Sequence, residues 1–423
     1  MDALGSAGSA YRDHIYAAGF SGRRVAVSGV DVRNLLDLAL AYVDQTLQAN
    51  RRSDDLFHAY NILQLRPGAA AIGRLYPMLE GQVAILSSGL LTGGEALTLL
   101  RSLRASAIYR ADQHSYMLYP DRDLPGFLTK NTLAPDHLQS ILLVERLMER
   151  GDRTILAQDE DGFYHFNGGF RNAKDVAAAL ARLGSDPALA DLVAEDGPRL
   201  SALFETTFDH ASFTGRSGTF FAYEGLGSIY WHMVSKLLLA VQENFWWARA
   251  AGAPPTILDG LSSAYYDIRA GIGFNKSPDV YGAFPTDPYS HTPKGQGARQ
   301  PGMTGQVKEE ILTRWGELGV RIHRGSLIFD PALLRAEEFG SEPGTLGYVG
   351  VDGQNHILPV PANAIAFTLC QTPVILIRAG VRRIEIEFVH GKRIVLEGDR
   401  LDPSMARHIF RRDGEIARLF VSL

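Results

Sequence analysis

The stretch 291-HTPKGQGARQPGMTGQVKEEILTRWGELGVRIHRGSLIFDP-331 contains the change of pattern that decides the fold. It opens with small and basic residues, becomes helical after Gly302-Met303, and ends as a short apolar strand. Strong helical signals precede this stretch, and strand signals follow it. The order predicts a mainly α-helical domain over residues 1–318 and a β-sandwich over residues 319–423.

Helical periodicity dominates the first part of the chain. Apolar residues recur at three- and four-residue spacing in the segments 33–50, 134–151 and 174–186. Segment 228–247 is apolar on most sides, which predicts a buried helix. Long connections rich in Gly, Pro and Asp separate the helices, and such loops are uncommon unless they are functional.

Short strands are expected after residue 320. Their segments are 321–329, 345–351, 364–370 and 373–379, followed by a hairpin over 383–398 with His390-Gly391 at its turn. Cys370 falls in one of these apolar segments, so we expect a buried, unreactive thiol. As the single cysteine of the chain, it excludes an intramolecular disulfide.

Composition excludes several classes of function. The 423 residues have a formal net charge of −5 with acids and bases interspersed, which argues against a nucleic-acid-binding surface. No apolar stretch is long enough to span a bilayer, and no secretory signal opens the sequence. The expectation is a soluble, cytoplasmic protein without a membrane or nucleic-acid partner.

Motifs for common cofactors are absent. The sequence has no HExxH, CxxC, Walker loop, GxSxG or GxGxxG after a strand. Its 12 histidines lack the spacing of metal ligands. We therefore expect no metal and no organic cofactor, and three loops remain as candidates for chemistry.

The first loop, 204–233, supplies the candidate acids Asp209 and Glu224. Phenylalanines and Tyr223 surround them, and an apolar pocket keeps a carboxyl group protonated, as a general acid requires. The alternative is structural: Glu224 would begin a helix and Asp209 would cap a turn. Arg216 and Tyr223 are candidates for contact with a substrate.

The second loop, 286–305, predicts an anion site. His291 and Arg299 precede Thr304 and Gly305, where the helical pattern begins. Backbone N–H groups at a helix start, a hydroxyl and nearby cations together suit a phosphate. The simpler interpretation makes Thr304 a helix cap and leaves the basic residues unexplained.

The third loop, 109–127, combines Arg110, Asp112 and Gln113 with three tyrosines. Sugars bind such surfaces, because their hydroxyls need polar partners and their C–H faces need aromatic rings. The alternative, a polar loop covering helix ends, fits equally well.

The stretch 291–331 resembles the junction between the catalytic and C-terminal domains of cellobiose-phosphorylase-like enzymes, which are inverting glycoside phosphorylases of the six-hairpin class. In order and spacing, the resembling residues are Met303-Thr304-Gly305, Leu318-Gly319-Val320-Arg321 and Phe329-Asp330-Pro331. The resemblance implies an (α/α)6-type helical toroid, possibly incomplete, before the β-sandwich. It also implies that Thr304 and Gly305 contact phosphate.

A second stretch, 209-DHASFTGR-216, resembles the family's general-acid motif in the separation of Asp209 from Arg216. Ser212 stands where the family has its catalytic aspartate, so Asp209 or Glu224 takes that role or the chain is not a working phosphorylase. Fewer helices are visible than the twelve a complete toroid needs. This predicts a homo-oligomer or association with a missing N-terminal part.

The resemblance implies phosphorolysis of a glucan-type oligosaccharide, with inorganic phosphate as co-substrate. Two alternatives stay open. One is an inverting hydrolase, whose second carboxylate would be Glu224, Asp287 or Glu309. The other is a non-catalytic carbohydrate-binding or assembly subunit of a split enzyme.

Overall fold

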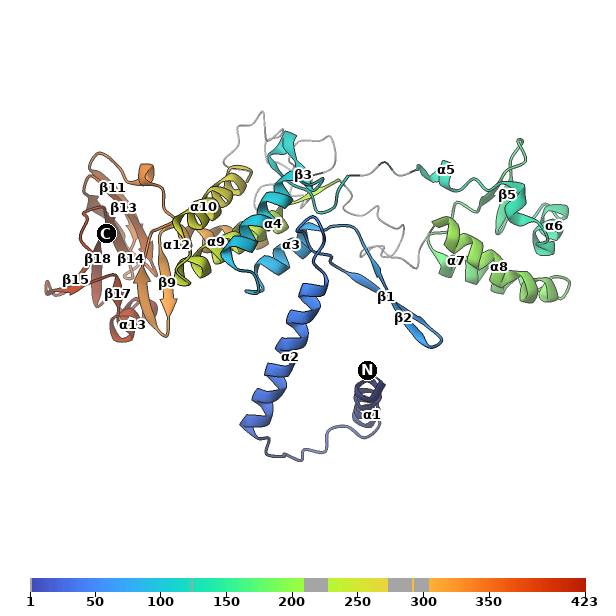
Figure 1. Ribbon diagram of the computed structural model, residues 1–423, viewed down its shortest axis with the longest axis horizontal. Coiled ribbons are helices and arrows are strands. Elements are labelled where there is room, and N and C mark those ends of the chain that lie inside the picture. The colour runs from blue at the N-terminus through green and yellow to red at the C-terminus, as the bar shows by residue number, and fades with distance from the viewer. Residues whose placement is uncertain (1, 122, 124, 209–226, 273–290, 293–303) are drawn as a thin grey trace. The chain divides into compact units, whose positions relative to one another are not determined.

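The computed structural model describes residues 2–121, 123, 125–208, 227–272, 291–292 and 304–423 (Figure 1). The chain divides into two units, Met1–Arg51 and Arg52–Leu423. The first unit contains helices α1 (Asp2–Ala18) and α2 (Gly29–Ala49). Ser28 caps α2 by accepting a hydrogen bond from the Val30 N–H, and no residue of α2 is buried. The predicted helix over 33–50 is thus confirmed.

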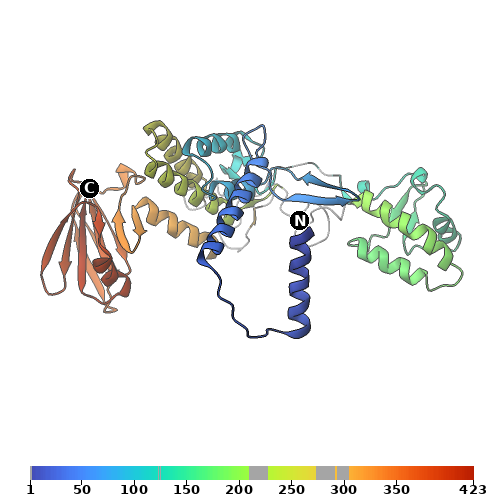
Figure 2. The same cartoon turned by 60° about the horizontal axis from the view of Figure 1, so that its bottom comes forward.

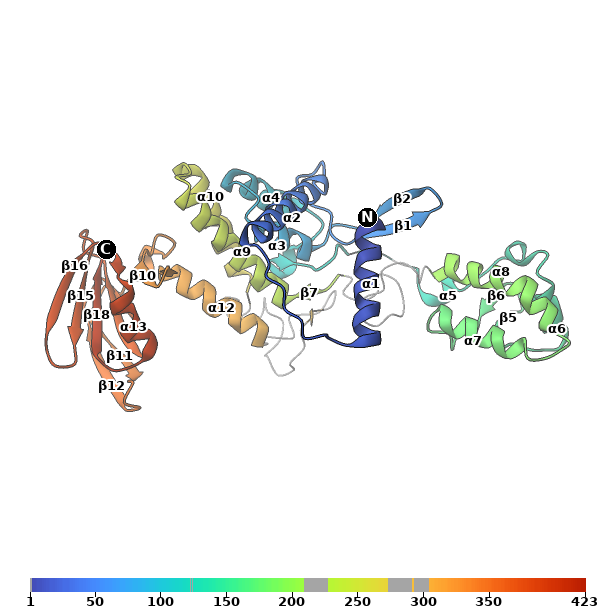
Figure 3. The same ribbon diagram turned by 90° about the horizontal axis from the view of Figure 1, so that it is seen from below.

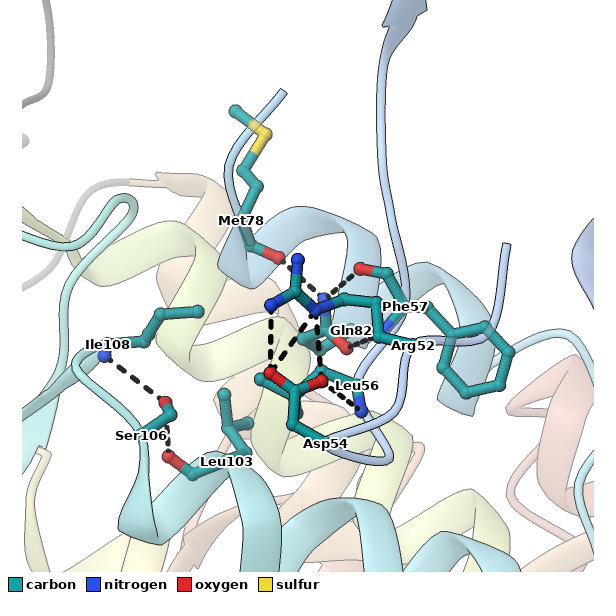
Figure 4. A network of polar contacts seen from close by, with 9 residues as sticks. All are labelled: Arg52, Asp54, Leu56, Phe57, Met78, Gln82, Leu103, Ser106 and Ile108. Atoms are coloured by element: carbon teal, nitrogen blue, oxygen red, sulfur yellow. Dashed lines mark hydrogen bonds and ion pairs between the residues drawn. The ribbon is translucent and has the colours of Figure 1, made fainter. Parts of the chain in front are cut away.

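Polar contacts fix the first segment of the second unit, residues 52–57 (Figure 4). Gln82 is fully buried, accepts from the Phe57 N–H at 2.9 Å and donates to the Phe57 carbonyl at 2.8 Å. Asp54 bonds both the Arg52 guanidinium and the Leu56 N–H. These bonds hold residues 52–57 against the following helix, α3 (Leu79–Leu86). A hairpin of β1 (Asn61–Arg66) and β2 (Ala69–Arg74) lies between them in sequence.

Helix α9 (Trp231–Ala250) is the centre of the helical part (Figure 3). It packs against α3, α4 (Gly93–Ala105), α10 (Pro255–Ala270) and α12 (Thr304–Glu317). Most of its side chains are buried, because neighbours cover nearly every side of it. The buried helix predicted over 228–247 is confirmed in α9.

Helices α9 and α12 approach closely at Gly316. A Cβ on Gly316 would lie 2.0 Å from Gln242 Oε1 of α9, so only glycine fits. Gln242 also donates to the Thr313 carbonyl at 2.7 Å. Beside this contact, the Glu317 carboxylate is 1% exposed and binds Arg269, Arg314 and the Tyr265 hydroxyl. Burial, reinforced by Glu317, raises the pKa of Tyr265, so its hydroxyl remains a donor.

The chain between Leu118 and Ser228 is an insertion into this helical part, and its described residues are 119–121, 123, 125–208 and 227. The Leu118 N–H donates to the Ser228 carbonyl at 2.8 Å, so the two ends of the insertion meet. Within it, Phe127 stacks on Phe208 with ring centroids 6.0 Å apart. The described residues of the insertion have a core of their own, drawn only from residues 133–208.

The insertion contains mainly helices. They are α5 (Phe127–Lys130), α6 (Leu142–Glu149), α7 (Ala173–Leu183) and α8 (Ala190–Phe208), with α7 and α8 side by side (Figure 1). Its described residues also contain the 3-10 helix η2 (Pro135–Leu138) and an antiparallel pair of short strands, β5 (Leu156–Gln158) and β6 (Tyr164–Phe166).

The sequence predicted a single helix over 134–151, and this prediction is wrong. Ser140 has a φ of 66°, which interrupts the chain between η2 and α6. The buried Asp196 carboxylate then accepts from the Leu143 N–H at the start of α6. The helix predicted over 174–186 is confirmed as α7. Both segments belong to the insertion core rather than to the helices around α9.

The strand predicted over 321–329 is two strands. β9 (Val320–His323) and β10 (Ser326–Phe329) pair through a tight turn at Arg324 and Gly325, both with positive φ. β17 (Arg400–Leu401) adds a third strand.

A five-stranded sheet follows, in the order β13-β14-β18-β15-β16. Figure 2 shows it as the red arrows near the C-terminus. Its strands are β13 (Ala364–Leu369), β14 (Thr372–Ile377), β15 (Arg383–Phe388), β16 (Arg393–Glu397) and β18 (Ile416–Ser422). The hairpin predicted at His390-Gly391 is confirmed in β15 and β16.

Both faces of the sheet are covered. Along β14, Val374 and Leu376 pack into one cluster with residues of α13 (Pro403–Arg411) and β10. Ile375 packs on the other face with the hairpin of β11 (Gly344–Val349) and β12 (Asn355–Val360). This explains why the sequence of β14 is apolar without alternation.

Cys370 is only half-buried, which corrects the expectation of a buried thiol in a strand. Cys370 and Gln371 form the two-residue turn between β13 and β14, with φ values of 48° and 69°. The apolar segments 364–370 and 373–379 are therefore one hairpin. The (α/α)6-type toroid, possibly incomplete, the β-sandwich and the division at residue 318 stay predictions.

Gly316→Ala should destabilise the packing of α9 on α12 by about 1–3 kcal/mol, because the added methyl group overpacks Gln242. The matched control is Gly94→Ala, since the nearest atom to a Cβ there is 4.0 Å away. Thermal unfolding followed by circular dichroism measures both. Equal melting temperatures for the two variants would contradict this account of the contact.

Phe204→Ala should destabilise the insertion by about 3–5 kcal/mol, because Phe204 is 1% exposed among Phe166 and Phe208. Hydrogen exchange should rise throughout 133–208 and stay unchanged in α9 and α12. Phe163→Ala, at a ring 40% exposed in the same insertion, is the control. Faster exchange spreading equally into α9 would show that the insertion core is not independent.

Candidate functional site

Three short strands bring the three predicted loops together. β4 (Ser115–Tyr116) of the third loop lies beside β7 (Ile229–Tyr230), at the end of the first. β7 pairs with β8 (His291–Thr292) of the second, with Tyr230 opposite His291. The described ends of the loops, far apart in sequence, therefore meet at one place.

Two long helices begin at this place. Near its start, α9 meets the second turn of α12, where His232 faces Glu309. Further along, Gln242 of α9 meets Thr313 and Gly316 of α12. The two helices therefore run in the same direction. Their N-terminal ends, where the helix dipoles place partial positive charge, therefore lie on the same side of this helix pair.

His232 and Glu309 connect these two helix starts. The His232 Nε2 lies 3.6 Å from Glu309 Oε2, and its Nδ1 lies 3.3 Å from the Tyr230 hydroxyl. Glu309 is 4% exposed, and a buried carboxylate needs a cationic or donor partner. His232 is thus held between the strand pair and α12.

The third loop folds as a small hairpin. β3 (Tyr109–Arg110) pairs with β4, and the 3-10 turn η1 (Ala111–Gln113) joins them. Arg110 is buried and binds the exposed carboxylate of Asp112 through two nitrogens, at 2.9 Å each. Gln113 is 5% exposed. Of these three predicted substrate contacts, Asp112 is the exposed one, and the roles of all three stay predictions.

The position of His114 depends on a close backbone approach. A Cβ on Gly271 would lie 2.0 Å from the His114 carbonyl oxygen, so the hairpin touches the end of α10 only because residue 271 is glycine. Burial raises the pKa of Tyr116 in the same hairpin, which keeps that phenol neutral.

Several predicted site residues lie outside the described residues: Asp209, Arg216, Tyr223, Glu224 and Arg299. For His291, Thr304 and Gly305 the structure gives the backbone. His291 lies in β8, and α12 begins at Thr304, so the predicted helix start is confirmed. The anion-binding and acid roles of these residues stay predictions.

The junction residues of the phosphorylase resemblance have structural contacts. Gly319 has a φ of 74°, and a Cβ there would lie 2.2 Å from the Asp330 carbonyl carbon. Asp330 forms an ion pair with Arg249 of α9 at 3.0 Å. The Arg321 guanidinium lies over the Trp246 ring. These residues join the helices to the strands.

Sequence reasoning missed His232, because the apolar pattern around it indicated only a core helix. The one sequence feature that pointed to His232 was its position near the start of the helix that follows the first loop. Among the described residues, no group of three or more His, Cys, Asp or Glu could hold a metal ion. Within that part of the chain, no helix is long and apolar enough to cross a membrane.

Comparison with known families identifies the insertion. Residues 124–211 match the model described as GH149 phosphorylase insertion domain 2. This is about a fifth of the chain, and it coincides with the segment that has its own core. The match supports a relationship to glycoside phosphorylases, which are carbohydrate-active enzymes. The comparison with curated proteins gives no match.

Proposed function

We propose that this chain carries the phosphate-binding part of the active site of an inverting glycoside phosphorylase that acts on a glucan-type oligosaccharide. The observation that supports this most is the common end of α9 and α12, where His232 and β8 also lie. Aligned helix N-termini attract an anion through their N–H groups and dipoles. The match of the insertion to a phosphorylase domain supports the same class of reaction.

In the proposed reaction, phosphate lies at the start of α12 near His291, Arg299, Thr304 and Gly305. One phosphate oxygen attacks the anomeric carbon, and the bond from that carbon to the glycosidic oxygen breaks. Asp209 or Glu224 donates its proton to the departing oxygen. The products are a sugar 1-phosphate of inverted configuration and a shortened oligosaccharide. Arg110, Asp112, Gln113, Arg216 and Tyr223 are the proposed sugar contacts.

Hydrolysis would need a carboxylate to activate water on the face opposite the acid. Glu309 is the described candidate for that role, and its carboxylate faces His232 from a buried position. This arrangement suits a group that positions His232 better than one that meets water. Burial of Glu309 therefore counts against this one candidate for the base of a hydrolase, and Glu224 and Asp287 lie outside the described residues.

The test is incubation with a panel of β-linked glucose oligosaccharides and inorganic phosphate, with release of sugar 1-phosphate as the readout. Asp209→Asn and Glu224→Gln are assayed in parallel. Loss of the proton donor should lower kcat by about 100-fold or more in one of them. Asp136→Asn, in the insertion, is the control and should keep full activity.

Reducing sugar released without phosphate would show hydrolysis. Retained oligosaccharide binding with no turnover on any substrate would support a non-catalytic subunit. Unchanged phosphorolysis in both acid variants would remove Asp209 and Glu224 from the mechanism.

A further inference from the structure

The hairpin of β1 and β2 is an isolated pair of strands. Its six residue pairs follow one register without a bulge, and Pro67 and Gly68 form its turn (Figure 1). Among the described residues, neither strand pairs with a third. Two strands alone are marginally stable in water, because they bury little apolar surface. The outer edges of the hairpin present backbone N–H and C=O groups that a further strand can pair with.

The base of the hairpin is fixed to α3 on both sides. On the side of β1, a Cβ on Gly81 would lie 2.4 Å from the Ala59 Cβ, so a larger residue at 81 would displace this segment. On the side of β2, the Leu79 N–H donates to the Leu118 carbonyl at 3.0 Å. The hairpin is thus held at both ends, and a partner would not have to order its base.

One face of the hairpin is apolar. Leu63 lies opposite Ile72, and Leu65 lies opposite Ala70. These four side chains share one face, because residues directly opposite each other, and every second residue of a strand, point the same way. Leu63, Leu65 and Ile72 are 53%, 75% and 63% exposed. The described residues therefore leave most of this apolar face open to a partner.

The outer edge of β1 lacks the usual protection of an edge strand. Natural edges are blunted by lysine, proline, bulges or inward-pointing charges. From Ile62 to Leu65 the strand has no charge and no proline, and only Arg66 at its end is charged. β2 consists mainly of alanine and glycine, whose side chains give little cross-strand contact. Of the two edges, β1 is therefore the better one for docking.

The sequence of β1 is complementary to itself in antiparallel pairing. If Gln64 lies opposite Gln64 of a second copy, Leu63 of each strand lies opposite Leu65 of the other. Each Arg66 then lies opposite Ile62, and the two arginines are about 13 Å apart along the strands. This separation exceeds the Debye length of about 8 Å at physiological ionic strength, so the two like charges are largely screened.

The same register joins the two apolar faces. Across four strands, one row contains Ile72 and Leu63 of one copy followed by Leu65 and Ala70 of the other, and two-fold symmetry repeats this row. The two Gln64 amides meet at the symmetry axis on the opposite face, where each has both a donor and an acceptor. A patch that matches itself in this way suits a symmetric dimer.

We propose that two copies of this chain associate through β1, in a four-stranded antiparallel sheet β2-β1-β1-β2 centred on Gln64. Four strands supply the pairing that an isolated hairpin lacks. Two strands of six residues bury less area than the roughly 1,600 Å² of a typical stable complex, so the association should be reversible and depend on protein concentration. The proposal does not rest on the proposed function.

Sedimentation velocity of the full chain over a wide range of concentration tests the association. A monomer–dimer equilibrium is expected. Leu65→Lys should raise the dimer dissociation constant about tenfold or more, because it places a charge in the apolar row. The matched control is Leu128→Lys in α5, since Leu128 is 79% exposed and Leu65 is 75% exposed. This control should dimerise as the unaltered chain does.

Cysteine cross-linking tests the register. Opposite Cα atoms of an antiparallel pair lie about 4.5–5.5 Å apart, within the range that a disulfide spans. Cys370→Ser removes the native thiol. In that background, with oxidised glutathione as the oxidant, Gln64→Cys should form a covalent dimer. Ala71→Cys, directly opposite Gln64 on β2, is the control and should not.

Several results would overturn the proposal. They are a monomer at every concentration, equal dissociation constants in the two lysine variants, and association into species larger than a dimer. A cross-link through residue 71 in place of residue 64 would put the contact on β2 and would also overturn it. Unchanged melting temperatures show that the variants fold, and the cross-link decides if Leu65→Lys does not. No substrate is used, so these results are independent of the proposed function.

Discussion

The contact between Gly316 of α12 and Gln242 of α9 is the constraint on which the helical part depends. It fixes how closely the two helices approach each other at this point. The same stretch of α12 holds Glu317, whose buried charge is balanced by two arginines and whose carboxylate also accepts a hydrogen bond from the Tyr265 hydroxyl. A buried carboxylate with these partners gives α12 one register on its neighbours, because any shift would leave charges unpaired. The candidate anion site is a consequence of this packing.

The insertion shows how this fold separates stability from function. Its ends meet at Leu118 and Ser228, and among the described residues its core cluster is drawn from residues 133–208 alone. The loops that the sequence marked for chemistry are attached to the packed helices by the short strands β4, β7 and β8. Because rigid elements hold the loop ends, the loops themselves can differ in sequence while their ends remain together.

Sequence reasoning predicted best where one periodicity extended over a whole element. α9, α7 and the β15–β16 hairpin were all predicted. It failed where a single residue with positive φ broke a pattern, as at Ser140, Arg324 and Cys370, because apolar spacing carries no information on φ. The insertion could not be predicted from the sequence for a different reason. Helices that belong to two separate cores have the same apolar periodicity, and only their contacts show which core each one joins.

The candidate site was predicted in part. The start of α12 at Thr304 could be read from the small residues and charges that precede it, whereas the roles of the three loops stay predictions. His232 could not, because its meaning comes from facing Glu309 across two helices. The interpretation of Arg110 also changes, because its guanidinium, which was expected to bind a sugar, forms an ion pair with Asp112.

Calorimetric titration with inorganic phosphate tests the central claim, an oxyanion site at the common start of α9 and α12. The account predicts saturable binding that weakens about tenfold or more in His232→Ala, a loss of about 1.4 kcal/mol or more. His356→Ala, at a histidine paired with Asp352 near the hairpin β11–β12, should bind as the unaltered chain does. Equal affinity in both variants, or no saturable binding in the unaltered chain, would contradict it.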